Sequence, residues 1–158
     1  ALKKARLPVY DHYSRRTDLG LYRVLFEQKF NLSRTYFMPP KILIVDDEAP
    51  HRQMLQAVMS AEGYEIQEAE DGQTAIAGVA NQFYDLILMD IQLPDFDGYE
   101  ATRRIKANPA LSAIPIFAVT SYALSGDDVK AYEAGCDAYV SKPFSPRALL
   151  AKIREFIS

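Results

Sequence analysis

Short hydrophobic runs recur along the chain after residue 40, and an amphipathic segment separates each run from the next. The runs span residues 42–45, 64–68, 84–89, 114–119 and 138–140. They are too short for ordinary helices, and the most apolar of them lack the alternation of a half-buried strand, which is typical of strands covered on both faces. We therefore predict five strands at these positions.

The segments between these runs carry apolar residues at helical spacing. We predict helices over 50–61, around 75–80, over 99–107, over about 126–134 and over 145–157. The first helix should bury a face made of Met54, Leu55, Val58 and Met59. The last, with Ser145 as its cap and Pro146 in its first turn, should bury Phe156. Strands that alternate with helices predict an α/β fold with a parallel sheet and crossover helices.

Asp90 stands at the end of the central hydrophobic run and before a loop that contains Pro94 and Gly98. The carboxyl ends of strands form the edge at which open α/β sheets bind ligands. A single aspartate at this place is also typical of a turn or a helix cap. In either interpretation, Asp90 should lie at the mouth of a loop and outside the core.

Polar residues also follow three other strands of the predicted sheet. Asp46 and Asp47 come directly after the first strand, Thr120 after the fourth and Lys142 after the fifth. Each has an ordinary alternative: the aspartates could cap the next helix, Thr120 could be a strand residue and Lys142 a solvated surface charge. Because parallel strands end at one edge of the sheet, these residues together with Asp90 predict a site there.

Composition bounds the class of protein. A chain of 158 residues with 49% hydrophobic and 25% charged residues is typical of one soluble globular domain. No run approaches the roughly 20 apolar residues that span a bilayer, so we expect a cytoplasmic protein without membrane contact. The single cysteine, Cys136, excludes an internal disulfide and is expected to be buried, whereas His12 and His51 are expected at the surface.

Charge divides the chain near residue 40. Residues 1–40 hold eight Lys or Arg against three acidic residues, whereas residues 41–158 hold ten against eighteen. The acidic part is a poor partner for nucleic acid, and we expect no direct contact with it. The basic leader 1–40 has no readable function. It contains one predicted amphipathic helix at 18–30, and it could be vector-derived, an extended start site or the end of a preceding domain.

The motifs at the strand ends resemble those of the receiver domain of two-component response regulators. The matching segments are Ile42-Leu43-Ile44-Val45-Asp46-Asp47-Glu48, Leu88-Met89-Asp90 with Pro94 and Asp97-Gly98 downstream, Val119-Thr120, and Tyr139-Val140-Ser141-Lys142-Pro143-Phe144. The resemblance covers residues 41–158 and is greatest to free-standing receivers. It implies a flavodoxin-like, three-layer α/β/α fold with strand order 2-1-3-4-5 and five helices.

The resemblance also implies roles for individual residues. Asp90 would accept a phosphoryl group from a phosphohistidine on a sensor histidine kinase or a histidine phosphotransfer protein. Mg²⁺ would be held by Asp46, Asp47, Asp90 and the backbone carbonyl of Gln92, because this ion prefers oxygen ligands.

Further residues would assist the transfer and report it to a partner. Lys142 would bring a charge, and Thr120 a hydroxyl group, to the phosphoryl oxygens. Thr120 and Tyr139 would form a switch that changes the surface over 126–157, where a downstream protein would bind. The peptide bond between Lys142 and Pro143 would be cis.

These implied properties favour a signalling switch that catalyses its own phosphorylation and dephosphorylation over an enzyme with a separate substrate. We expect a free-standing receiver that changes protein–protein contacts. One alternative is the terminal receiver of a larger hybrid sensor kinase, with residues 1–40 as its linker. A phosphatase of related topology is a third hypothesis.

Overall fold

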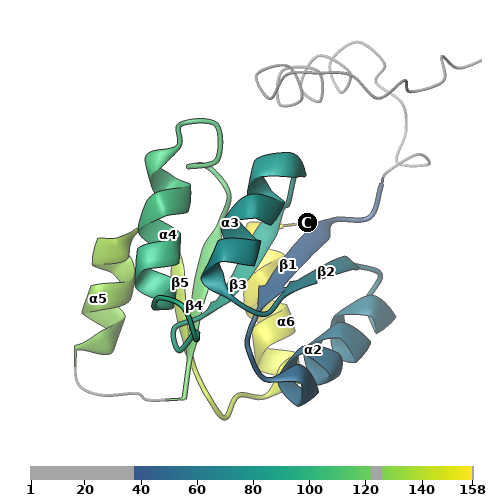
Figure 1. Ribbon diagram of the computed structural model, residues 1–158. Coiled ribbons are helices and arrows are strands. Elements are labelled where there is room, and N and C mark those ends of the chain that lie inside the picture. The colour runs from purple at the N-terminus through teal and green to yellow at the C-terminus, as the bar shows by residue number, and fades with distance from the viewer. Residues whose placement is uncertain (1–37, 122–125, 158) are drawn as a thin grey trace, which may run out of the picture. The chain divides into compact units, whose positions relative to one another are not determined.

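The hydrophobic runs form a five-stranded parallel sheet in the computed structural model, which describes residues 38–121 and 126–157. The strands lie in the order β2-β1-β3-β4-β5 (Figure 1), which confirms the predicted flavodoxin-like order. They are β1 (Lys41–Val45), β2 (Glu65–Ala69), β3 (Leu86–Asp90), β4 (Ile116–Thr120) and β5 (Ala138–Ser141). The helix predicted at 18–30 lies outside the described residues.

Within these residues five helices connect and follow the strands. They are α2 (Ala49–Ala61), α3 (Gly72–Asn81), α4 (Gly98–Ala107), α5 (Asp127–Ala134) and α6 (Pro146–Phe156). The side chains of Asp71, Asp97 and Ser145 each accept a hydrogen bond from the backbone amide three residues later. These caps give partners to helix amides that have none within the helix. Across the described part of the chain, no helix has the length and apolar character needed to cross a membrane.

The helices cover the two faces of the sheet in separate layers (Figure 1). Helices α3, α4 and α5 pack on one face, where Val79 and Ile105 contribute to the core. Helices α2 and α6 pack on the other face through residues such as Leu55 and Ile153. All residues of β3 and β4 are buried, as expected for strands covered on both sides.

Two residues that the pattern assigned to the core lie largely at the surface instead. Met54 is 40% exposed and Phe156 is 41% exposed. Met54 precedes the buried Leu55, and one residue along a helix turns the side chain by about 100°, so both cannot face the sheet directly. Phe156, at the end of α6, meets the buried Phe117 ring edge-on, with ring centroids 4.9 Å apart, and leaves its other side exposed.

Candidate functional site

The polar residues that follow the strands meet at one edge of the sheet. Asp46 follows β1, Asp90 is the last residue of β3, Thr120 is the last of β4, and Lys142 follows β5. The parallel register pairs Asp90 with Val119 at the end of β4, so these strands end side by side. Segments from the whole length of the domain therefore contribute to one cluster.

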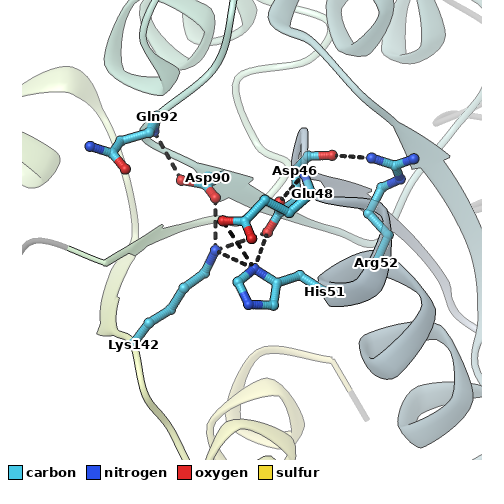
Figure 2. A network of polar contacts seen from close by, with 7 residues as sticks. All are labelled: Asp46, Glu48, His51, Arg52, Asp90, Gln92 and Lys142. Carbon is cyan, nitrogen blue, oxygen red and sulfur yellow. Dashed lines mark hydrogen bonds and ion pairs between the residues drawn. The ribbon is translucent and has the colours of Figure 1, made fainter.

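Lys142 bridges two buried carboxylates at the centre of this cluster (Figure 2). Its Nζ lies 2.9 Å from Asp46 Oδ2 and 2.8 Å from Asp90 Oδ2. The Lys142 side chain is only 10% exposed, which rules out the alternative of a solvated surface charge. Asp90 stands at the end of β3 and before the loop, as expected, but it is only 4% exposed, so the expectation that it lies outside the core is wrong. The peptide bond between Lys142 and Pro143 is cis.

The buried position of these groups changes their pKa values. Burial raises the pKa of the Asp90 carboxyl group, and the charge of Asp46 adds to the rise. Hydrogen bonds from Lys142 and the backbone amide of Gln92 oppose it. Burial alone would lower the pKa of Lys142, but its hydrogen bonds to Asp90 and Asp46 and their charges raise it. The arrangement thus keeps Lys142 as an ammonium ion among carboxylates.

Asp47 completes a set of three carboxylates. One oxygen atom from each of Asp46, Asp47 and Asp90 lies within 4.8 Å of the other two. Asp46 and Asp90 are buried, whereas Asp47 is exposed, so the set is open to solvent on one side. These donors fit Mg²⁺, which binds carboxylate oxygens and retains several waters. The backbone amide of Gln92 donates a hydrogen bond to Asp90 Oδ1 at 2.9 Å, and the side chain of Gln92 extends away from the carboxylates (Figure 2).

The loop between β3 and α4 returns closely over the end of β3, which helps to cover Asp90. The amide of Gly98 donates to the carbonyl of Ile91 at 2.9 Å. A Cβ atom at Gly98 would lie 2.1 Å from the Asp90 carbonyl oxygen, so only glycine fits here. Asp95 ties the same loop to the start of α3 by accepting the Gly72 amide at 3.0 Å.

Thr120 and Tyr139 lie on neighbouring strands on the Lys142 side of the site. Thr120 is 3% exposed. Tyr139 is half-buried and packs against the core on the face covered by α4 and α5. Its hydroxyl oxygen is buried and has no hydrogen-bond partner among residues 38–121 and 126–157. Burial, and then the charges of Asp127 and Asp128, raise the pKa of Tyr139.

Two residues that sequence reasoning did not assign to the site also line it. The Nδ1 atom of His51 lies 3.3 Å from Lys142 Nζ, and 3.6 Å from both Asp46 Oδ2 and Glu48 Oε1 (Figure 2). The side chain of His51 is 38% exposed, which agrees with the surface position expected for it. Its contacts with Lys142, Asp46 and Glu48 were not expected. The place of these two residues in the sequence could have identified them, because Glu48 and His51 follow the acidic pair Asp46 and Asp47 at the start of α2.

Comparisons with known proteins agree with this geometry. The model of the response regulator receiver domain matches residues 42–154. The phosphate regulon transcriptional regulatory protein PhoB of Pseudomonas aeruginosa is 42% identical over 113 residues, which are 72% of this chain and 49% of PhoB. The polar-differentiation response regulator DivK of Brucella anthropi is 36% identical over 120 residues, which are 76% of this chain and 98% of DivK. The chain therefore spans about half the length of PhoB and nearly all of DivK.

A solved structure supports the same assignment. The receiver domain of a sensor histidine kinase from Pseudomonas aeruginosa PAO1, crystallised with a magnesium ion in its active-site cleft, is similar with a TM-score of 0.71 and 36% identity. The likeness covers 76% of this chain and 98% of that one. From the match over residues 42–154, the strand order and these relatives, the chain belongs to the response regulator receiver domain family of two-component signalling.

Proposed function

We propose that this receiver accepts a phosphoryl group from a phosphohistidine onto Asp90 and thereby changes its contacts with another protein. The observation that carries the proposal is the position of Lys142, whose ammonium group contacts Asp90 Oδ2 at 2.8 Å at the carboxyl edge of the sheet. A carboxylate beside a fixed cation can act as a covalent nucleophile toward a negatively charged group, because the cation offsets the repulsion between them.

In the proposed step, a carboxylate oxygen of Asp90 forms a bond to phosphorus while the P–N bond of the phosphohistidine breaks. The electron pair of that bond stays on the imidazole nitrogen, and the ring leaves neutral when its other nitrogen carries a proton. Lys142 attracts the phosphoryl oxygens, and the hydroxyl of Thr120 donates a hydrogen bond to one of them. Catalysis in this account consists of positioning and charge neutralisation.

Mg²⁺ is the cofactor that the acidic cluster suits. Asp46, Asp47 and Asp90 would hold it with the backbone carbonyl of Gln92. When bound, the ion would neutralise charge on the transferring phosphoryl group. The three side chains carry more negative charge than Lys142 alone offsets, which favours a divalent cation at this edge.

The environment of the Tyr139 hydroxyl group supports a switch that connects Asp90 with the surface over 126–157. Its buried hydroxyl, which lacks a partner within the described part of the chain, makes the present ring position costly. A phosphoryl group that drew Thr120 toward it would change the space beside this ring. The partner reading the change would bind the surface made of α5, β5 and α6.

The acceptor is tested with Asp90→Asn and the full chain. Wild-type protein should be labelled by radiolabelled acetyl phosphate or a cognate phosphorylated kinase only when Mg²⁺ is present, and chelation with EDTA should abolish labelling. Asp90→Asn should keep its circular dichroism spectrum and lose the label. Asp128→Asn, an exposed change in the first turn of α5, is the control and should be labelled normally. Normal labelling of Asp90→Asn would disprove the assignment.

A second candidate is the terminal receiver of a larger hybrid kinase, with residues 41–158 as receiver and residues 1–40 as linker. The likeness to a receiver from a sensor histidine kinase favours it. Sequencing the gene upstream of the codon for Ala1 distinguishes the two. A reading frame that continues into a kinase domain supports the hybrid, and a start codon within the leader supports the free-standing receiver.

A further inference from the structure

We propose that Asp46, Glu48 and His51 form a second cation site, which takes a transition metal ion with affinity for imidazole, such as Zn²⁺. One ligand atom from each of these residues lies within 4.8 Å of the other two. The site shares Asp46 with the acidic cluster to which the proposed function assigns Mg²⁺. Only the expected competition between Zn²⁺ and Mg²⁺ rests on that proposed function.

The imidazole ring of His51 distinguishes this cluster from an ordinary acidic surface. His51 Nδ1 lies 3.6 Å from Asp46 Oδ2 and 3.6 Å from Glu48 Oε1. Zinc ligands at about 2.0–2.1 Å in a tetrahedron lie roughly 3.3–3.5 Å apart, which is close to the two distances from His51 Nδ1. The ammonium group of Lys142, 2.9 Å from Asp46 Oδ2, would have to move away for an ion to bind. Three protein ligands would leave the remaining position to water.

The backbone around Asp46 directs these atoms toward one another. Asp46 Oδ1 accepts the amide of Glu48 at 2.8 Å, which leaves Oδ2 to face His51 and Lys142. Glu48 occupies the N-cap position of α2, yet its side chain makes no capping hydrogen bond in the described structure. Its carboxylate instead extends toward His51 (Figure 2).

The contact between His51 and Lys142 shows that the Nδ1 atom of the ring points into the cluster. Lys142 is an ammonium ion, which has only hydrogen-bond donors, and its Nζ lies 3.3 Å from His51 Nδ1. The role of Nδ1 in this contact depends on the tautomer of the ring, and only a lone pair on Nδ1 can accept from the ammonium group or bind a metal. The position is therefore one where a cation already meets the imidazole nitrogen and the Asp46 carboxylate.

The donor set predicts which ions would bind. Mg²⁺ selects oxygen ligands and rarely takes imidazole, whereas Zn²⁺, Ni²⁺ and Cu²⁺ bind it well. An ion at this site would use Asp46 and would repel the ammonium group of Lys142 that now lies 2.9 Å from Asp46 Oδ2. Zn²⁺ and Mg²⁺ should thus weaken each other's binding by the same factor. If the proposed function holds, Zn²⁺ should also slow phosphorylation of Asp90.

The test measures Zn²⁺ binding to the full chain by isothermal titration calorimetry without Mg²⁺ or phosphoryl donor. His51→Gln should weaken Zn²⁺ binding at least tenfold, because even partners that only support a metal ligand are worth about 10–100-fold in affinity. His12→Gln, which removes the other histidine of the sequence, is the matched control and should bind Zn²⁺ as wild type does.

A second variant and a second readout protect the test against misfolding. Glu48→Gln changes a side chain that is 58% exposed, so it should fold normally and bind Zn²⁺ at least several-fold more weakly. In wild-type protein, saturating Zn²⁺ should shift the ¹⁵N resonance of His51 Nδ1. Wild-type affinity in His51→Gln, or a loss of affinity in His12→Gln instead, would overturn the second site. Either result leaves the labelling of Asp90 untouched, so the two proposals fail separately.

Discussion

Two lysines with little exposed surface lie at opposite ends of the sheet, and their surroundings differ. Lys142, at the carboxyl ends of the strands, contacts two buried carboxylates at 2.8 and 2.9 Å. Lys106, in α4, lies at the amino ends of β4 and β5, where it donates to the carbonyl oxygens of Ser112 and Ile114 at 3.1 and 2.8 Å and to Asp137 Oδ2 at 2.9 Å. Polar contacts hold both lysines in place, but only around Lys106 do the donors and charges of the lysine match those of its partners.

The difference supports a structural role for Lys106 and the role in phosphoryl transfer that we propose for Lys142. The three donors of Lys106 meet three acceptors, of which one is charged, and Asp137 Oδ2 also accepts the amide of Ile116 at 2.9 Å. Around Lys142, two buried carboxylates contact one ammonium group, and Asp47 brings a third carboxylate oxygen within 4.8 Å of theirs. A satisfied polar network stabilises the fold, whereas an excess of one charge favours the binding of a further ion or ligand. The comparison teaches that the charge balance around each lysine, more than its burial, indicates the role.

Replacing Lys142 by Met should have the largest effect, and the effect should be on chemistry. Removal of one group that stabilises developing charge typically lowers a rate by about 100-fold or more. We therefore expect labelling by acetyl phosphate with Mg²⁺ to fall about 100-fold in Lys142→Met, measured on protein whose near-ultraviolet circular dichroism shows a folded state. Labelling within threefold of wild type would remove Lys142 from the proposed transfer step.

Replacing Lys106 by Met should act on stability instead. The change leaves Asp137 and two carbonyl groups without their charged donor, at a cost of about 2–3 kcal/mol in the free energy of unfolding. Urea unfolding at pH 7 measures this loss, and the labelling rate of the folded protein should stay within twofold of wild type. Lys130→Met is the control, because this lysine is 65% exposed and its ion pair with Asp127 should be worth less than about 0.5 kcal/mol. A loss of labelling without a loss of stability in Lys106→Met would contradict the comparison.

The sequence was sufficient for the fold and for much of the candidate site because patterns local to the chain located the strands and their ends, and the resemblance to receiver domains supplied the strand order. Hydrophobic runs located the strands, and Asp90, Thr120 and Lys142 were found because each stands at a strand end. Contacts between distant segments were not readable. His51 and Lys142 are 91 residues apart and meet because the carboxyl ends of β1 and β5, after which they stand, lie at the same edge of the sheet.

The rotation of a helix about its axis was equally unreadable at single-residue precision. The amphipathic pattern of α2 correctly predicted that Leu55 and Met59 are buried, but it also assigned the exposed Met54 to the same face. Lys106 gave no signal either, because a lysine in the last turn of a helix is ordinary and its partners lie in loops 6 to 31 residues away. Which residues face inward depends on how each helix rests on the sheet.

Asp95 offers the smallest and most selective test, since it is a carboxylate at the same end of the sheet as Asp90 with the opposite surroundings. Burial raises its pKa, but hydrogen bonds from the amides of Phe96, Gly72 and Gln73 together outweigh burial and lower the pKa below the ordinary value of 3.8. A carboxyl group whose pKa is lower in the folded state stabilises the fold above its unfolded pKa, and this contribution is lost as the pH falls through the folded pKa. Asp95→Asn should therefore cost up to about 1 kcal/mol at pH 7, because solvent screens an exposed group. The difference between variant and wild type in urea unfolding should shrink as the pH falls below 3.8, where the wild-type carboxylate takes up its proton. An equal difference at pH 7 and at pH 2.5 would show that Asp95 acts through its shape and not through its charge.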